Sequence, residues 1–517
     1  MRLYQYTIAL LSLALAASCS KDLGNYEYNE INELNIGNVN AEYKVRTGID
    51  TLRIKPDIKT TLDEGDTSRY RYLWILRTGT LKFDTIGKTR NLNYPVKLDP
   101  TLYELYYRLL DKKTGVTWNA TTKVVVSTAS SRGWLLMGEN EQGFAEAEML
   151  SMINDTVHIK NILSTSGLPP LKAPVSFVHT GGGEREIKLW AFTKTGSYFL
   201  NRATLTGSTT NNLKRITFMS ENIDPATMHP IALAPQIRNA AGALGATTSR
   251  AMITVGGDLF AASSFITGGD FFNNPVNRVA AEPDVRLPAA PYLMFSIGNT
   301  NSGMNAVVWY DKKNERFLNF ASFFATSSTL LTDGSANNFF PWSQPAGRTL
   351  IYAENTRNTD GNSTHGNSFA IMKDADHAHH IYKFYANGTN PAKRGYYLVS
   401  PIATDFDKAR FYAFSSNRTV VFYAVGNKLY AYDYNPVNQK IYQFPEITDE
   451  ISMLKFDTQY DHIMNSLYIA TYNSTTKGTL KRYRVGTNPN VVELLPQENS
   501  TWTGLVKIKD INWRAVN

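Results

Sequence analysis

The sequence of 517 residues contains a single cysteine, Cys19. One thiol cannot form a disulfide within its own chain, so stabilisation by internal cross-links is excluded. The fold must therefore draw its stability from the burial of apolar side chains and from sheets whose edges are paired or covered.

Long hydrophobic runs and blocks of one charge are also missing. No apolar stretch after residue 18 reaches the roughly 20 residues that a membrane helix needs. The formal net charge is +8, from 53 Lys and Arg against 45 Asp and Glu, and the basic residues are scattered along the chain. This pattern indicates a solvated basic surface and argues against nucleic-acid binding.

Several catalytic and metal-binding motifs do not occur. The sequence has no HExxH, CxxC, GKS or GxSxG, and its GKT at residues 87–89 follows Lys82 where the P-loop pattern GxxxxGK[ST] requires glycine, so the signatures of the enzyme classes that carry these motifs are missing. The glycines 181–183 lack the strand–loop–helix setting of a phosphate loop, and residues 63–66 are too few for an EF-hand calcium loop. No pair of the 45 acidic residues stands out as catalytic carboxylates.

Aromatic and apolar residues are plentiful. Hydrophobic residues make up 43% of the chain and aromatics 12%, with 29 Tyr and 25 Phe, whereas charged residues make up 19%. A composition rich in Tyr and Phe, with many Thr, Asn and Gly, favours strands and turns over helices. We therefore expect an all-β protein.

The first 19 residues have the pattern of an export signal. Arg2 precedes an apolar run over 8–17, and the small residues Ala16, Ala17 and Ser18 lead directly into Cys19. This arrangement resembles the lipobox of bacterial lipoproteins, in which the cysteine is lipidated and becomes the mature N-terminus. We expect residues 1–18 to be a signal peptide and Cys19 to carry the lipid anchor.

The segment behind the cysteine carries a second resemblance. Residues 19–35 begin Cys-Ser-Lys-Asp-Leu-Gly-Asn-Tyr and continue with Tyr-Asn-Glu-Ile-Asn-Glu. They resemble the start of the PKD-like lipoproteins of Bacteroidota, which implies a lipidated tether. The pair Lys21-Asp22 is similar in part to the acidic signal that directs such lipoproteins to the outer face of the outer membrane.

Residues 36–127 have the pattern of one small β-sandwich, because short strand-like runs alternate with turn signals. Tyr70, Tyr72 and Trp74 share one parity and should lie on one face of a strand. Trp74 resembles the core tryptophan of immunoglobulin-like and PKD-type sandwiches.

After a polar linker at 127–132, residues 133–517 show divergent repeats of short strands. Residues 421–444 read as three strands separated by turns at Gly426-Asn427 and 435–438, and residues 307–320 repeat the second half of this pattern. We expect a β-propeller of about seven blades, whose first blade is completed by the last strand of the chain. The alternative is a large irregular β-sandwich or a β-solenoid.

Two groups of side chains are candidate sites. Phe340, Trp342 and Trp502 adjoin polar stretches and could bind a ligand from surface loops, although packing in the core is the alternative. On a strand, His377 and His379 would share a face that could bind a metal. A solvated hairpin is the better interpretation, so we expect neither a metal nor any cofactor besides the lipid.

The resemblance to PKD-like lipoproteins also implies a function. It suggests an accessory surface lipoprotein that works with a SusC-type transporter and a SusD-type lipoprotein in the uptake of oligosaccharides or peptides. This binding role is preferred to catalysis. The alternatives are a surface hydrolase or lyase built on the propeller, with convergent carboxylates or a metal in its channel, and an adhesin or spacer.

Overall fold

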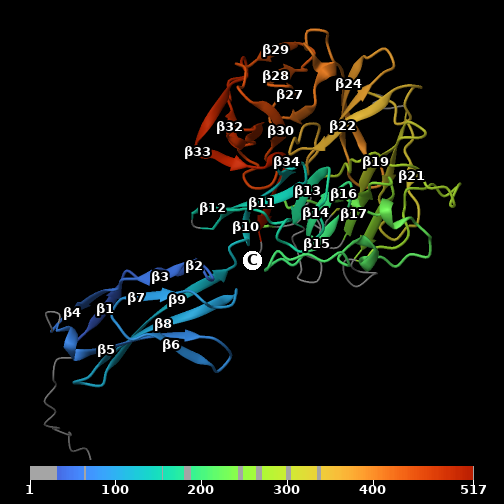
Figure 1. The fold of residues 1–517 in the computed structure, drawn as a ribbon. Helices are drawn as coiled ribbons and strands as arrows, with labels where there is room; N and C mark the ends of the chain where they lie inside the picture. Colours follow the sequence, from blue (N-terminus) through green and yellow to red (C-terminus); the bar gives the residue numbers. More distant parts are fainter. Residues whose placement is uncertain are drawn as a thin grey trace, which may run out of the picture. The chain divides into compact units, whose positions relative to one another are not determined.

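The computed structural model confirms an all-β protein (Figure 1). It describes residues 32–62, 66–153, 155–179, 188–242, 249–263, 271–298, 304–334 and 339–515. The signal peptide, Cys19 and most of the expected tether lie outside these residues. Helical structure within them is limited to four 3-10 turns: η1 (Thr67–Arg69), η2 (Leu213–Ile216), η3 (Pro225–Thr227) and η4 (Phe406–Lys408). None of the helices in the described part is long and apolar enough to cross a membrane.

The chain divides into two compact units, and the division follows Val126. The first unit contains a five-stranded sheet in the order β2-β9-β8-β5-β6 and two strand pairs, β1-β4 and β3-β7. Its strands are β1 (Leu34–Gly37), β2 (Glu42–Arg46), β3 (Thr51–Ile54), β4 (Asp57–Thr60), β5 (Tyr70–Arg77), β6 (Phe83–Gly87), β7 (Leu92–Pro95), β8 (Leu102–Asp111) and β9 (Thr117–Ser127).

The core of the first unit is centred on Trp74 of β5. Tyr70, Tyr72 and Trp74 alternate with more exposed residues and are all buried, which confirms that they share one inward face. Trp74 is fully buried, and its ring centroid lies 4.3 Å from that of Tyr107 on the neighbouring strand β8. Its indole N–H donates to the carbonyl of Thr89 at 3.0 Å, so the one polar atom of the ring is satisfied in the core.

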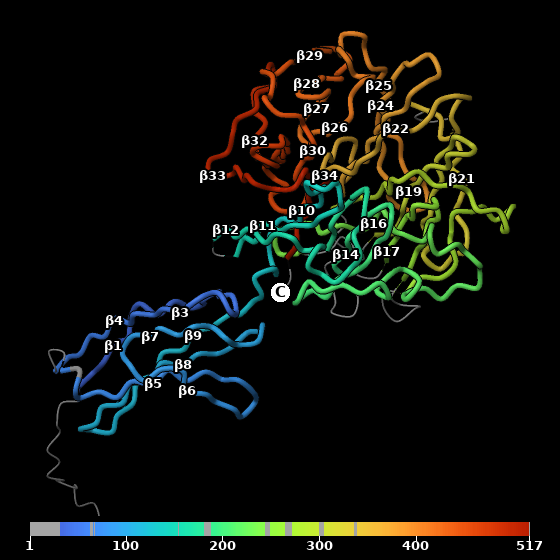
Figure 2. Tube along the Cα trace, in the orientation of Figure 1, coloured from blue at the N-terminus to red at the C-terminus, as the bar shows by residue number. Residues whose placement is uncertain are grey.

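The second unit contains seven antiparallel sheets among its described residues, and they follow one another along the chain (Figures 1 and 2). The first has the order β12-β11-β10-β34, three sheets of three strands follow, and three sheets of four strands end the series. The strands of the first four sheets are β10 (Arg132–Glu139), β11 (Ala145–Met152), β12 (Thr156–Ile159), β34 (Lys507–Ala515), β13 (Pro174–His179), β14 (Leu189–Thr193), β15 (Tyr198–Leu200), β16 (Pro230–Ala234), β17 (Ser249–Thr254), β18 (Leu259–Ser263), β19 (Val307–Asp311), β20 (Arg316–Phe320) and β21 (Thr329–Leu330).

The last three sheets are the most regular. They comprise β22 (Thr349–Asn355), β23 (Ser368–Lys373), β24 (His379–Tyr385), β25 (Ala392–Leu398), β26 (Phe411–Phe414), β27 (Val420–Val425), β28 (Lys428–Asp433), β29 (Lys440–Gln443), β30 (Glu450–Phe456), β31 (Leu467–Asn473), β32 (Lys477–Val485) and β33 (Leu494–Leu505). The predicted turn at Gly426-Asn427 is confirmed, because it joins the paired strands β27 and β28, and Gly426 has a φ of 60°.

The last strand of the chain belongs to the first sheet. β34 pairs antiparallel with β10, so that Trp134 lies opposite Trp513 and Leu136 opposite Ile511. This pairing confirms the expected return of the C-terminal strand to the start of the repeats. It joins residues that are 368 to 383 positions apart in the sequence and covers an edge of β10 that would otherwise be open.

Buried hydrophobic clusters connect the seven sheets in a cycle. Each pair of successive sheets, from the first to the seventh, shares one such cluster. A further cluster joins the seventh sheet to the first, where the ring of Trp134 contacts that of Tyr468 with centroids 4.8 Å apart. The core of the second unit is therefore a closed succession of inter-sheet layers.

Candidate functional site

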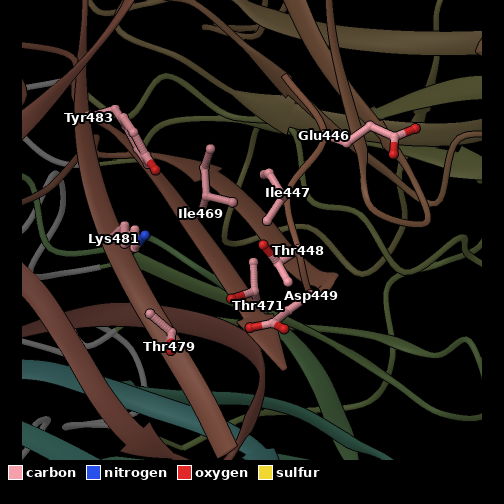
Figure 3. A pocket seen from close by; sticks show the side chains of 9 residues that line it. All are labelled: Glu446, Ile447, Thr448, Asp449, Ile469, Thr471, Thr479, Lys481 and Tyr483. Carbon is pink, nitrogen blue, oxygen red and sulfur yellow. The ribbon is translucent and has the colours of Figure 1, made fainter. Parts of the chain in front are cut away.

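A pocket of about 320 Å³ opens on the seventh sheet (Figure 3). Its volume is near the lower end of the range for small-molecule sites, about 300–1000 Å³, which suits one compact group of a ligand. Nine residues line it: Glu446, Ile447, Thr448, Asp449, Ile469, Thr471, Thr479, Lys481 and Tyr483.

The floor of the pocket is one face of the strand pair β31–β32. Thr479, Lys481 and Tyr483 occupy alternate positions of β32, and Ile469 and Thr471 do so on β31. Alternate residues of a strand point to the same side of its sheet. The register places Ile469 opposite Lys481 and Thr471 opposite Thr479, so the five side chains form adjacent rows on one face.

The wall of the pocket is the segment 446–449, which connects β29 of the sixth sheet to β30 of the seventh. The amide of Ile447 donates to the carbonyl of Asn427 at 3.1 Å, and Ile447 packs against the cluster between the two sheets. Lys428 lies 3.7 Å from the Glu446 carboxylate. These contacts fix the wall to the sixth sheet. Figure 3 shows Thr448 and Asp449 beside Thr471 of the floor, whereas Glu446 points away from it.

The polar side chains of the pocket are available to a ligand. In the described part of the chain, Thr448, Asp449, Thr471, Thr479 and Lys481 have no hydrogen bond or ion pair through their side chains. Their hydroxyl, carboxylate and ammonium groups include donors, acceptors and both signs of charge. A ligand with several hydroxyl or amide groups can thus replace water at five side chains without breaking a bond inside the protein.

Two buried or half-buried carboxylates outside the pocket, Asp510 of β34 and Glu354 of β22, are hydrogen-bonded within the protein. Asp510 accepts from Ser176 at 2.5 Å, from Lys455 at 2.7 Å and from Asn512 at 2.7 Å. These bonds join strands β13, β30 and β34, so Asp510 connects three neighbouring sheets. The arrangement stabilises the assembly of sheets, and each oxygen of Asp510 accepts at least one hydrogen bond within the protein.

Glu354 makes a similar connection between the fifth and sixth sheets. It accepts hydrogen bonds from the amide of Phe414 and, at 3.0 Å, from the hydroxyl of Tyr352. Burial raises the pKa of Glu354 from 4.5 to about 7, although these two bonds oppose the shift. Both carboxylate oxygens are thus occupied within the protein.

Two of the aromatic residues proposed as surface binders lie in the core, which corrects that expectation. Phe340 and Trp342 are 2% and 3% exposed and belong to the cluster between the fourth and fifth sheets. The ring of Phe340 stacks on Tyr382 with centroids 4.1 Å apart. Neither ring presents a free face to a ligand. Trp502 of β33 is half-buried against the cluster between the seventh and first sheets.

The two histidines considered for a metal do not share a strand face. His377 is exposed in the turn before β24 and has a φ of 71°, whereas His379 is buried on β24 itself. Among the residues that the structure describes, no group of three His, Cys, Asp or Glu side chains is arranged to hold a metal ion. His380 instead contacts Asp374 at 2.8 Å and Tyr396 at 2.9 Å.

The pocket was not anticipated from the sequence. The alternation of Thr479, Lys481 and Tyr483 was a visible signal of a half-exposed strand face. Segment 446–449, however, is a short polar connection like many others in the chain. Its position over that face follows from the packing of the sixth sheet on the seventh, which no local pattern encodes.

Comparisons with known proteins give one family and several distant folds. Residues 19–166 match the model of the PKD-like family, which extends past the first unit into β10–β12. No curated protein matches the chain.

Three solved structures of Bacteroides proteins are similar to this chain at low identity. A quinonprotein alcohol dehydrogenase-like protein from Bacteroides thetaiotaomicron has 12% identity and a TM-score of 0.37, over 93% of this chain and 99% of that one. A candidate 6-phosphogluconolactonase from Bacteroides uniformis has 10% identity and a TM-score of 0.33, over 86% and 99%. The extracellular domain of a candidate hybrid two-component system from Bacteroides thetaiotaomicron has 9% identity and a TM-score of 0.33, over 88% and 64%.

Proposed function

We propose that this chain is a lipid-anchored protein of the outer membrane that binds a nutrient ligand and does not transform it. The observation that carries the proposal is the pocket on the seventh sheet, where five polar side chains without partners in the described part of the chain surround a small cavity. Sites of this kind recognise a ligand by hydrogen bonds and charge.

We propose that the second unit is a seven-bladed β-propeller and that it is the ligand-binding unit. The return of β34 to β10 and the cycle of inter-sheet clusters support this architecture. A ring closed in this way protects its sheet edges and holds the connections between blades in fixed positions. The pocket lies between two such blades, the sixth and the seventh.

A binding role is preferred to hydrolysis because of the state of the carboxylates. A glycosidase of the usual kind needs an acid and a base that reach the substrate. Asp510 and Glu354 instead accept hydrogen bonds from neighbouring sheets. Of the two pocket carboxylates, Glu446 lies 3.7 Å from Lys428, and Figure 3 shows its carboxylate pointing away from Asp449.

Side chains, and not backbone groups, would recognise the ligand of this pocket, whether the ligand is an oligosaccharide or a peptide. The strands of the floor, β31 and β32, are interior to the order β30-β31-β32-β33, so their backbone groups are already paired. A peptide cannot add to them as an extra strand, which is a common mode of peptide capture. One sugar ring or one amino-acid side chain of a longer ligand would fill the cavity.

The location and partners are part of the same proposal. Lipidation of Cys19 would anchor the chain, and the Lys21-Asp22 pair supports the outer face of the membrane. We propose a SusC-type transporter and a SusD-type lipoprotein as partners. Affinity purification from outer membranes should recover all three proteins, and it should fail with Cys19→Ala, which removes the anchor. Recovery of the anchored protein alone would contradict the partnership.

Ligand binding can be tested separately on the soluble chain that begins after Cys19. We expect one or more members of oligosaccharide and peptide panels to bind in calorimetry without being cleaved. The double variant Asp449→Asn with Lys481→Ala should weaken binding at least about tenfold, because it removes two charged contacts. Lys313→Ala, an exposed lysine in the turn between β19 and β20, is the matched control. Cleavage of the bound ligand would favour the hydrolase alternative.

A further inference from the structure

A buried arginine at the end of β34 has no anionic partner in the described part of the chain. Arg514 is 1% exposed, and its Nη2 donates to the backbone carbonyl of Arg202 at 2.8 Å. Its Nε and Nη1 are buried without an acceptor. Burial and the nearby charge of Arg202 lower the pKa of Arg514 to about 9, which leaves it charged at neutral pH.

Two further side chains lie close enough to interact with Arg514. His179 ends the neighbouring strand β13, is 1% exposed, and has no partner at either ring nitrogen in the described residues. Burial, Arg514 and Arg202 lower the pKa of His179 well below its usual value, so the ring is neutral and keeps one N–H donor. The guanidinium of the half-buried Arg202 is likewise without an acceptor in the described part.

Two other cations of the protein have carboxylate partners instead. Arg46, at 3% exposed, pairs with Asp50 at 2.8 Å, and the partly buried Lys455 pairs with Asp510 at 2.7 Å. Besides burial, the positive charges of arginines lower the pKa of Arg514 and of His179, and no carboxylate of the described residues contributes to either shift.

An uncompensated buried charge costs several kcal/mol. Water could satisfy the N–H groups, but it would not neutralise two guanidinium charges. An anion would do both, because charge-assisted bonds from guanidinium groups to an oxyanion are among the stronger hydrogen bonds in proteins.

We propose that Arg514, Arg202 and His179 form a binding site for a small oxyanion of the phosphate or sulfate class. The two guanidinium groups supply charge and the imidazole supplies a neutral donor. The site lies at the ends of β13 and β34, the strands by which the second sheet packs on the first. It is separate from the pocket on β31 and β32, so it does not depend on the nutrient ligand.

The first test uses the unmodified soluble protein. Thermal unfolding is measured in sodium phosphate and in sodium sulfate against sodium chloride at matched ionic strength and pH. Selective binding to the folded state should raise the unfolding temperature by about 2–4 °C, and the rise should saturate with concentration. An unfolding temperature equal in the three salts, or one that rises without saturation, would overturn the proposal.

The second test locates the effect. Arg202→Gln removes one guanidinium from a half-buried position and keeps the backbone carbonyl that accepts from Arg514. The variant should fold and lose most of the phosphate or sulfate response. Arg215→Gln changes an exposed arginine whose side chain contacts Asn211, and it should retain the full response. An undiminished response in Arg202→Gln would place the anion elsewhere and reject the site.

A third variant separates charge from packing. Arg514→Met keeps most of the buried volume while removing the charge, so it should abolish the anion response without requiring a new counter-ion. If Arg514→Met does not fold, the Arg202→Gln and Arg215→Gln pair still decides the question. An Arg514→Met protein that folds and responds like the unmodified chain would also overturn the proposal.

Discussion

At the scale of single residues, whether an aromatic side chain is buried or exposed depends on neighbours that are distant in the sequence. Phe339 and Phe340 are adjacent, yet Phe339 is 46% exposed and Phe340 is 2% exposed. The difference arises because Phe340 stacks on Tyr382 of the next sheet. Local sequence places both in the same polar loop, and only the inter-sheet contact distinguishes them.

This difference gives a prediction about stability. Phe340→Ala should destabilise the second unit by about 3–5 kcal/mol, since it removes a fully packed aromatic ring. Phe339→Ala should change stability by less than about 1 kcal/mol. Chemical denaturation followed by tyrosine and tryptophan fluorescence measures both. A Phe340→Ala protein that was fully stable but had lost ligand binding would contradict this prediction and indicate that Phe340 binds the ligand.

The raised pKa of Glu354 predicts that the free energy of unfolding depends on pH. Its pKa is about 7 in the folded protein and near 4.5 when exposed, so the stability that it contributes is complete below about pH 4.5 and is lost as the pH rises through 7. Glu354→Gln cannot ionise. Relative to this variant, the unmodified protein should lose up to about 3 kcal/mol between pH 5 and pH 8.

The measurement is denaturant unfolding of both proteins across that range. Glu498→Gln, at an exposed position of β33, should leave the pH profile unchanged. A pH profile of Glu354→Gln that runs parallel to that of the unmodified protein would show that the carboxylate does not become ionised in this range.

At the scale of elements, β34 is the strand that makes the succession of sheets cyclic. It supplies Ile508, Ile511 and Trp513 to the cluster between the seventh and first sheets. Without it, β10 would present an open edge and this cluster would lose a large part of its apolar surface.

Deletion of residues 507–517, which include β34, should therefore abolish the cooperative unfolding of the second unit and cause association through β10. Size-exclusion chromatography and thermal unfolding would detect these effects. Ile508→Asn should weaken the same unit through one fully buried position, whereas Lys509→Asn, at a half-exposed position outside the cluster, should have little effect. A monomeric truncated protein with an unchanged unfolding temperature would contradict the role of β34 as the closing strand.

At the scale of the whole molecule, the two units have separate hydrophobic cores. The first is built around Trp74, and the second consists of the seven inter-sheet clusters. Separate cores predict separate unfolding transitions.

Trp74→Ala should lower only the transition of the first unit, by about 3–5 kcal/mol, and should leave ligand binding on the seventh sheet intact. Differential scanning calorimetry of the soluble chain tests this prediction, with Trp118→Ala as a control at a half-buried position of the same unit. A single transition that shifts as a whole would show that the units unfold together.

The sequence by itself determined the features that depend on local pattern. Composition indicated an all-β chain, strand periodicity placed Tyr70, Tyr72 and Trp74 on one buried face, and the lone strand at the C-terminus indicated its return to the first sheet. These features follow from side-chain alternation and turn chemistry, which act over a few residues.

Only the tertiary structure decided which surfaces are available. It buried Phe340 and Trp342, engaged Asp510 and Glu354 in bonds between sheets, placed segment 446–449 over β31 and β32, and left Arg514 without a carboxylate partner in the described residues. The physical reason is common to all of these cases. Each depends on side chains from neighbouring sheets that are far apart in the sequence, and their meeting is fixed by the packing of one sheet on the next.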